Sequence, residues 1–86
     1  MTENYPSGFL VTLYGTAHCQ KTLYYRNVLD ERRVAYRFAD VASDPEAAKE
    51  LIALTGSAEK FPTFSIGGRK LRNPSLLDLE TALTRL

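Results

Sequence analysis

The first half of this chain contains two stretches with different apolar patterns, and each of them predicts a strand. Residues 9–14 are almost all apolar and rich in β-forming side chains, which is typical of a strand covered on both faces in the middle of an α/β sheet. Residues 34–39 alternate instead, with apolar side chains on one side and Arg37 on the other, and so predict a half-exposed strand at a sheet edge. A single helical pattern separates them, which predicts a βαβ unit with parallel strands.

The first predicted helix runs from about Cys19 to Arg33. Its inner face is marked by spacings of three and four, at Thr22, Tyr25, Val28, Leu29 and Arg32. The aromatic and aliphatic members of this face are expected to be core.

A second helix is predicted to begin in residues 43–46. Pro45 suits the first helical position with Asp44 as the cap, while Ser43 and Glu46 offer a competing capping box. Gly56 is expected to end the helix. The predicted inner face consists of Ala48, Leu51, Ile52 and Thr55.

The next stretch predicts a β-hairpin. Pro62 is expected to open the first strand, where its missing N–H is tolerated. Gly67-Gly68 forms a two-residue turn, and residues 69–72 return as a short, basic edge strand.

A helix closes the chain. Asn73-Pro74 is expected to cap it, and its narrow apolar stripe consists of Leu76, Leu79, Leu83 and Leu86. The resulting order, β-α-β-α-β-β-α, predicts an α/β fold with one four-stranded mixed sheet and helices on both faces. We expect residues 1–8 to be a flexible tail and residues 9–86 to be a single domain.

Composition narrows the possible functions. The chain has 86 residues, of which 44% are hydrophobic and 24% charged, as in an ordinary globular domain. A net charge of +1 does not favour nucleic acid or an acidic membrane surface as a partner. Without a long apolar stretch or a signal-peptide pattern, we expect a cytoplasmic, monomeric protein that does not bind membranes.

Cys19 is the only cysteine, so no disulfide can form within the chain. A lone cysteine is often a small, buried hydrophobic residue. This one, however, lies where a strand ends and a helix begins, and the N–H groups and dipole of a helix start stabilise a thiolate. Cys19 is therefore a candidate nucleophile.

These features together resemble the short form of the thioredoxin fold, the glutaredoxins. The likeness covers about residues 11–86. It includes residues 14–19, 34–36, 61–63 and 71–75. It is closest to the mycoredoxin branch of small actinobacterial redoxins, in which a similar Asn-Pro-Ser run opens the last helix.

The resemblance implies a role for several residues. Cys19 is similar in position to the family's nucleophilic cysteine, and Pro62 to its cis-proline. Phe61 would offer backbone groups to a bound thiol peptide. The segment that holds the γ-glutamyl carboxylate of glutathione at a helix N-terminus would be Asn73, Pro74 and Ser75.

Nearby basic residues have two interpretations. Lys21 is expected to favour the Cys19 thiolate through its charge, or to be a plain surface residue. Lys60 is expected to meet the carboxylates of a thiol peptide, together with Arg69, Lys70 and Arg72. Basic residues on a hairpin edge equally protect it against aggregation.

The chain also departs from the family. Thr22 stands where the resolving cysteine of a C-x-x-C motif is usual, and the Cys-Gly-Phe-Ser signature of cluster-carrying monothiol glutaredoxins is absent. Thr22 either donates its hydroxyl to the thiolate or simply fills the first turn. His18 is either an exposed loop residue or a general acid for the leaving thiol.

Three functions follow from the resemblance and its departures. The leading one is a monothiol thiol–disulfide oxidoreductase, in which Cys19 reduces mixed disulfides of protein substrates. It would have no tightly bound cofactor and would use glutathione, bacillithiol or mycothiol as co-substrate. The alternatives are a binding module that has lost catalysis and an iron–sulfur carrier, in which two copies would share a cluster through Cys19.

Overall fold

The computed structural model describes residues 10–86, and its elements follow the predicted order. They are β1 (Val11–Gly15), α1 (Gln20–Glu31), β2 (Arg37–Asp40), α2 (Pro45–Thr55), β3 (Thr63–Ile66), β4 (Arg69–Arg72) and α3 (Leu76–Thr84). The predicted tail, residues 1–8, and Phe9 lie outside the described residues.

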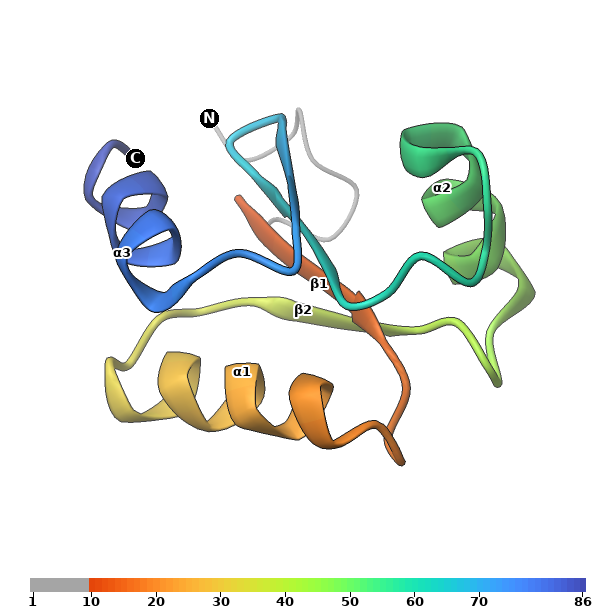
Figure 1. Cartoon of the computed structure of the whole chain (residues 1–86), viewed down its shortest axis with the longest axis horizontal. Coiled ribbons are helices and arrows are strands. Elements are labelled where there is room, and N and C mark those ends of the chain that lie inside the picture. Colours follow the sequence, from red (N-terminus) through yellow and green to blue (C-terminus); the bar gives the residue numbers. More distant parts are fainter. Residues whose placement is uncertain (1–9) are drawn as a thin grey trace.

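The strands form one mixed sheet in the order β2-β1-β3-β4. Strand β1 is parallel to β2 and antiparallel to β3, and β3 is antiparallel to β4. The βαβ unit and the edge position of β2 are therefore confirmed. Helices α1 and α3 cover one face of the sheet and α2 the other, as predicted (Figure 1).

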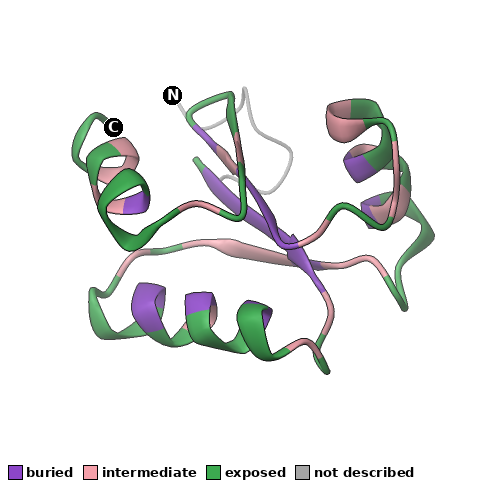
Figure 2. Cartoon of the chain, viewed as in Figure 1, coloured by how far each residue is buried: buried purple, intermediate pink, exposed green. Residues whose placement is uncertain are grey.

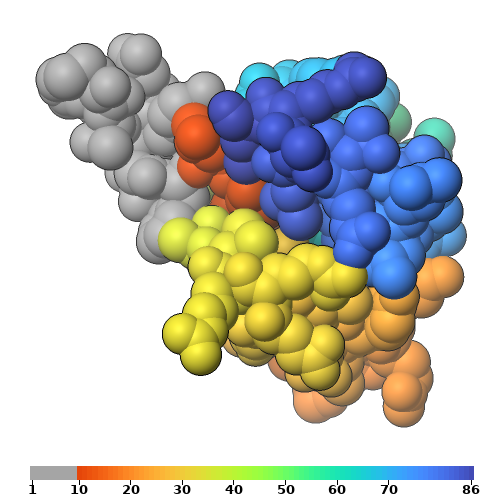
Figure 3. All heavy atoms as spheres, turned by 90° about the vertical axis from the view of Figure 1, so that its left-hand side faces the viewer, coloured from red at the N-terminus to blue at the C-terminus, as the bar shows by residue number. Residues whose placement is uncertain are grey.

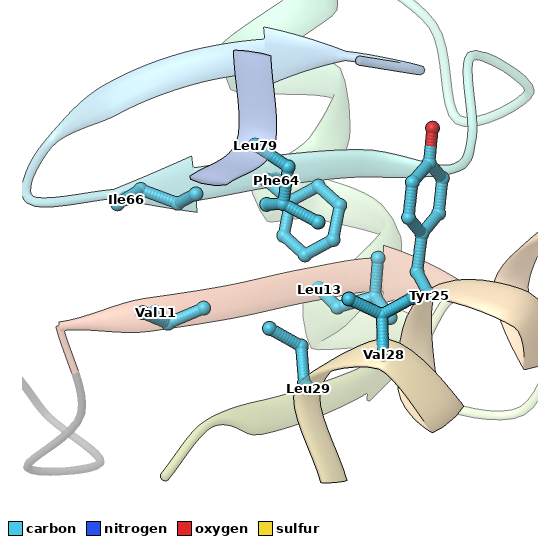
Figure 4. Close-up of a cluster of buried hydrophobic side chains, with 8 residues drawn as sticks. All are labelled: Val11, Leu13, Tyr25, Val28, Leu29, Phe64, Ile66 and Leu79. Carbon is cyan, nitrogen blue, oxygen red and sulfur yellow. The ribbon is translucent and has the colours of Figure 1, made fainter. Parts of the chain in front are cut away.

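The larger core lies between the sheet and the α1–α3 layer (Figure 2). Figure 4 shows its eight buried members, Val11, Leu13, Tyr25, Val28, Leu29, Phe64, Ile66 and Leu79. The buried face of α1 is as predicted, except that Arg32 is exposed and pairs with Glu80 of α3. Because each fully buried aliphatic or aromatic side chain contributes about 1.5–3 kcal/mol, this cluster is the main source of stability.

A smaller core lies beneath α2. Its buried members are Tyr14, Ala39, Ala47 and Leu51. The Tyr14 hydroxyl donates to Glu50 Oε1 at 2.8 Å. The Arg37 guanidinium donates to both Glu50 oxygens, at 2.9 and 3.2 Å. Polar bonds therefore attach α2 to the two strands beneath it, where apolar contacts are fewer.

The predicted strand limits need correction. The first strand ends at Gly15, one residue later than predicted, and the second begins at Arg37 instead of Val34. Arg33 has a left-handed φ of 57°, and the Val34 N–H donates to Leu29 O, so this stretch reverses the chain after α1. Val34 still packs against the larger core, as expected from its place on the apolar side of the alternating stretch.

The predicted inner face of α2 is correct at Leu51 but wrong at Ile52, and Ala47 is buried where Ala48 was predicted. Ala47 and Leu51 are buried, whereas Ile52 is 48% exposed. Asp44 accepts from the Glu46 N–H and is therefore the cap, and not Ser43. The helix ends at Gly56, whose φ of 88° confirms the predicted left-handed terminus.

The start of α3 also differs from the prediction. Ser75 is the N-cap, with its hydroxyl accepting from the Asp78 N–H at 3.1 Å, so Asn73-Pro74 does not cap the helix. The predicted stripe is shorter than expected, because Leu76 and Leu86 are 39% and 52% exposed. Asn73 has a φ of 50°, which turns the chain out of β4 before the helix begins.

The hairpin is confirmed, with Gly67 and Gly68 at φ 56° and 85° in its turn. Pro62 directly precedes β3, which begins at Thr63. No helix within residues 10–86 has the length and apolar character needed to cross a bilayer.

Candidate functional site

Cys19 is the N-cap residue of α1. Its backbone is extended, its N–H donates to Thr16 O at 3.2 Å, and its carbonyl accepts from the Leu23 N–H at 3.0 Å. The thiol is partly exposed and forms no disulfide. The first N–H groups of α1 therefore lie directly beside the sulfur.

These surroundings lower the pKa of the Cys19 thiol from its ordinary value of 9.0. The largest cause is the Thr22 side chain. Partial burial opposes it, and the backbone N–H groups of Thr22 and Lys21 and the Lys21 charge assist it. His18 is exposed and is not among the causes. A larger fraction of the thiolate, the attacking form, is thus present near neutral pH.

Thr22 lies fully buried under the start of α1. Its hydroxyl oxygen makes no hydrogen bond of ordinary geometry to any residue among 10–86. A buried hydroxyl without a partner costs about 1–3 kcal/mol. The Thr22 hydroxyl can therefore donate a hydrogen bond to the Cys19 sulfur when that sulfur is ionised.

Gly15 makes room for that hydroxyl. A Cβ at this position would lie 2.4 Å from Thr22 Oγ1 and 2.7 Å from Thr22 Cγ2, closer than side chains approach. The last residue of β1 must therefore lack a side chain for Thr22 to lie beneath Cys19. The sequence pattern suggested only that a glycine ended the strand.

The Phe61–Pro62 peptide bond is cis, as the resemblance implied. Pro62 is buried and directly precedes Thr63, which pairs with Tyr14 near the end of β1. The Thr63 hydroxyl donates to Lys60 O at 2.6 Å and closes this turn. The proline therefore lies at the end of the sheet where β1 leads into α1 (Figure 1).

Two bonds tie residues 73–75 to the other parts of the site. The Asn73 N–H donates to Pro62 O at 3.0 Å. The Tyr25 hydroxyl donates to Pro74 O at 2.5 Å and also lies 3.2 Å from Asn73 Oδ1. Figure 4 shows the Tyr25 oxygen pointing away from the apolar cluster.

Tyr25 was predicted only as core. The signal that was overlooked is its hydroxyl, because a buried tyrosine usually finds a hydrogen-bond partner. Its hydroxyl joins α1 to the segment that precedes α3.

A shallow groove of about 350 Å³ lies between α1 and the start of α3. It is lined by Lys21, Tyr24, Tyr25, Pro74, Ser75 and Leu76. Three residues predicted for the site, Lys21, Pro74 and Ser75, thus lie together. Tyr24, which is 45% exposed, had not been singled out.

The remaining predicted residues do not line this groove. Lys60 is exposed, and Phe61 packs against the smaller core on the α2 face. Within residues 10–86, no three His, Cys, Asp or Glu side chains gather closely enough to hold a metal ion. The described groups support the chemistry of a single thiol with a lowered pKa. The groove lies beside it in the sense that Lys21, two residues after Cys19, is part of the groove wall.

Comparison with known proteins identifies the family. The family model described as Glutaredoxin matches residues 11–71, more than half of the 86-residue chain. No curated protein matches this sequence significantly.

Solved structures share the fold. A mutant of a thioredoxin-like protein is 24% identical, with a TM-score of 0.79 over 87% of this chain and 95% of its own. A glutaredoxin from Archaeoglobus fulgidus is 15% identical, with a TM-score of 0.74 over 87% and 86%. A buckwheat glutaredoxin in complex with glutathione is 16% identical, with a TM-score of 0.68 over 88% and 77%.

Proposed function

This chain belongs to the glutaredoxin family, and we propose that it is a monothiol thiol–disulfide oxidoreductase in which Cys19 is the nucleophile. The family and the fold support thiol–disulfide exchange as the type of function. The observation that carries the monothiol proposal is the position of the chain's single cysteine, Cys19, at the N-terminus of α1, with the buried Thr22 where a second cysteine would be needed. The lowered pKa of Cys19 agrees with it.

The proposed reaction has two exchange steps. The Cys19 thiolate attacks the small-thiol sulfur of a protein mixed disulfide, and the protein thiolate leaves and takes up a proton. A disulfide between Cys19 and the small thiol remains. A second small thiolate attacks that small-thiol sulfur, so that the small disulfide forms and the Cys19 thiolate is restored. One free small thiol is consumed for each protein mixed disulfide that is reduced, and the products are the protein thiol and the disulfide of the small thiol.

The groove beside Cys19 supports a small thiol that carries carboxylates. The N–H groups of Leu76 and Leu77 begin α3 and are available to a carboxylate, with Lys21 on the opposite wall of the groove. In the proposal, Asn73 and Pro74 shape this end, and Ser75 begins the helix. One neighbour of the same fold is a buckwheat glutaredoxin in complex with glutathione, and glutathione is our first candidate here.

The loop before β3 would hold the other end of the small thiol. We assign the backbone of Phe61 to pairing with the thiol's own backbone, beside the buried Pro62. Lys60 is exposed at the edge of this loop and would meet a second carboxylate. Proteins with mixed disulfides are the proposed substrates, and a single copy of residues 9–86 is the proposed working unit.

A turnover assay with three mixed disulfides tests the proposal. Wild-type protein and Cys19→Ser are supplied with model disulfides of glutathione, bacillithiol and mycothiol. We expect turnover with at least one of them and a loss of about a thousandfold or more in Cys19→Ser, because an alcohol cannot replace a thiolate in this exchange. Lys49→Gln, on the far side of the sheet, is the matched control.

The pH dependence of Cys19 alkylation separates this proposal from the binding-module alternative. An oxidoreductase should show an alkylation midpoint below the ordinary value of 9.0. A slow thiol with an ordinary midpoint, together with no exchange on any of the three disulfides, would refute the proposal.

A further inference from the structure

A second groove, of about 330 Å³, lies between β4 and α3. Figure 3 shows the dark blue atoms of α3 beside the lighter blue atoms of the segment that precedes it. Three arginines line this groove, Arg69 and Arg72 from β4 and Arg85 from the end of α3. Asp78 is the one acidic side chain among its lining residues. The chain as a whole has a net charge of +1, so the positive charge is concentrated in this groove.

The three arginines are not held in ion pairs by the described chain. None of them forms an ion pair with a residue among 10–86, whereas Arg32 and Arg37 are both paired with glutamates. Lys70 differs, because its Nζ donates to Leu54 O at 3.1 Å on the α2 side. The groove therefore presents three arginine side chains that are available to an anionic partner.

Backbone groups of β4 are also available along the groove. In an antiparallel pair, hydrogen-bonded and non-hydrogen-bonded residue pairs alternate. The Asn73 N–H donates to Pro62 O, so these two residues form a hydrogen-bonded pair. The next pair along the hairpin, Arg72 and Thr63, is therefore a non-hydrogen-bonded pair. The same holds for Lys70, two residues back, and its partner Ser65.

It follows that the N–H and C=O groups of Lys70 and Arg72 point outward from the sheet. Strand β4 is the last in the order β2-β1-β3-β4, so no strand formed by residues 10–86 covers them. Neither residue makes a backbone hydrogen bond outside the sheet to any residue among 10–86. Such an edge can accept one more strand.

We propose that this groove binds an extended, acidic segment of a partner protein, which adds to β4 as a fifth strand. Its backbone pairs with Lys70 and Arg72, and its carboxylates meet Arg69, Arg72 and Arg85. An extended peptide satisfies both features of the groove together, whereas a compact anion would use only the arginines.

The position of the groove suggests what the partner is. Pro74 lines both this groove and the groove beside Cys19, so the two grooves adjoin at Pro74, before the start of α3. An acidic strand on β4 would therefore hold the rest of its protein near the reactive thiol. This assignment of the partner as a disulfide substrate rests on the function proposed above, whereas the binding itself does not.

Titration of a peptide probe tests the binding without the chemistry. The probe is a twelve-residue peptide with alternating glutamates, and its control has glutamine at the same positions. Both are titrated into Cys19→Ser protein, in which no exchange can occur. We expect the acidic peptide alone to bind, and its binding to weaken as salt is raised from about 0.05 to 0.5 M.

Charge-matched variants locate the site. Arg69→Gln/Arg85→Gln should weaken binding roughly fivefold, since each exposed pair contributes about 0.2–1 kcal/mol. The control Arg33→Gln/Lys49→Gln removes the same charge away from the groove and should bind as the parent does. Equal losses in the two double variants would overturn the proposal, because binding would then follow net charge alone.

Hydrogen exchange at individual amides tests the added strand. Bound peptide should slow exchange at the Lys70 and Arg72 amides, and leave the already bonded Leu71 amide unchanged. Inorganic triphosphate is the compact probe. If it competes fully while the peptide gives no protection at Lys70 and Arg72, the groove is a small-anion site and the proposal is wrong.

A substrate assay then separates this inference from the proposed function. Wild-type protein and the two double variants receive a mixed disulfide on the acidic peptide and one on a small thiol alone. A selective loss with the peptide substrate in Arg69→Gln/Arg85→Gln supports substrate docking. Failure of wild-type protein on both substrates refutes the proposed function, and leaves the binding result to be judged by the titration.

Discussion

Tyr14 and Tyr25 are both buried tyrosines whose hydroxyls reach distant parts of the chain, but they lie on opposite faces of the sheet. Tyr14 donates to the Glu50 carboxylate on the α2 face. Tyr25 donates to Pro74 O on the face that α1 and α3 cover. The pKa of Tyr14 is raised to about 12, by burial first and by Glu50 second. The pKa of Tyr25 is also raised, first by burial and second by the electrostatic effect of Tyr24.

The difference lies in what each hydroxyl holds. Glu50 is itself held by Arg37, so the bond of Tyr14 joins a side-chain network that attaches a helix to the sheet. Pro74 belongs to the wall of the groove beside Cys19, so the bond of Tyr25 fixes the shape of a proposed binding site. The same residue type thus serves stability on one face and positioning on the other.

Removal of the acceptor on the α2 face should have the largest effect on stability. Glu50→Ala leaves Tyr14 and Arg37 without their shared partner, and we expect the free energy of unfolding to fall by about 2 kcal/mol. Urea denaturation measures it. Lys49→Ala, at one end of an exposed ion pair, is the control and should change stability little. A changed rate of Cys19 alkylation in Glu50→Ala would contradict the separation of the two faces.

The matched pair Tyr14→Phe and Tyr25→Phe tests the comparison directly. Each change removes one hydroxyl, so each should lower the free energy of unfolding by about 1 kcal/mol. Only Tyr25→Phe should raise the KM for the small thiol, roughly fivefold if that free energy is also lost from binding. Steady-state kinetics at varied thiol concentration measure it. An equal rise in KM for Tyr14→Phe would show that both tyrosines act through general stability.

A smaller effect is expected from the hydroxyl beneath Cys19. Thr22→Val keeps the shape but removes the donor, so the pKa of Cys19 should rise and its alkylation rate at pH 7 should fall about threefold. The control is Thr22→Ser, which keeps a hydroxyl and should restore most of the rate. If Thr22→Val is alkylated as fast as the wild type, Thr22 occupies the first turn of α1 without donating a hydrogen bond to the thiolate.

The smallest effect is the pH dependence of the α2 attachment. Arg37 holds the folded pKa of Glu50 below its ordinary 4.5, so this contribution to stability is complete above about pH 4.5 and is lost as the pH falls through the folded pKa. The folded pKa of Tyr14 is about 12 against an ordinary 10.0, so its contribution is complete below pH 10 and lost toward pH 12. The difference in thermal stability between wild type and Glu50→Ala should narrow as the pH falls through the folded pKa of Glu50. A difference that stays constant with pH would contradict the assignment.

Much of the fold was predictable because local patterns carry it. The order of elements, the hairpin turn at Gly67-Gly68 and the helix end at Gly56 followed from periodicity and turn chemistry. Element ends were less predictable. The pattern at Val34 is that of a strand, but the turn at Arg33 delays pairing until residue 37. The inner face of α2 was predicted correctly at Leu51, but Ala48 was chosen instead of Ala47 because two adjacent alanines give no periodic signal.

The candidate site was only partly predictable. Cys19 at a helix start was anticipated from the local pattern, and the cis bond before Pro62 was implied by the resemblance to glutaredoxins. The bond from Tyr25 to Pro74 was not, because its partners are far apart in the sequence. The role of Gly15 was missed for the same reason, since it depends on the position of the Thr22 side chain.

By itself, therefore, the sequence determined the elements, their order and the single thiol at the start of α1, because these depend on neighbouring residues. Only the tertiary structure decided what surrounds that thiol. Packing places a buried hydroxyl beneath Cys19 and ties residues 73–74 to Tyr25. It also gathers the arginines of β4 and α3 along one groove, where no residue in the described part of the chain forms an ion pair with them. Such contacts join segments that no local pattern relates, and they come into being only when the sheet brings its strand ends together.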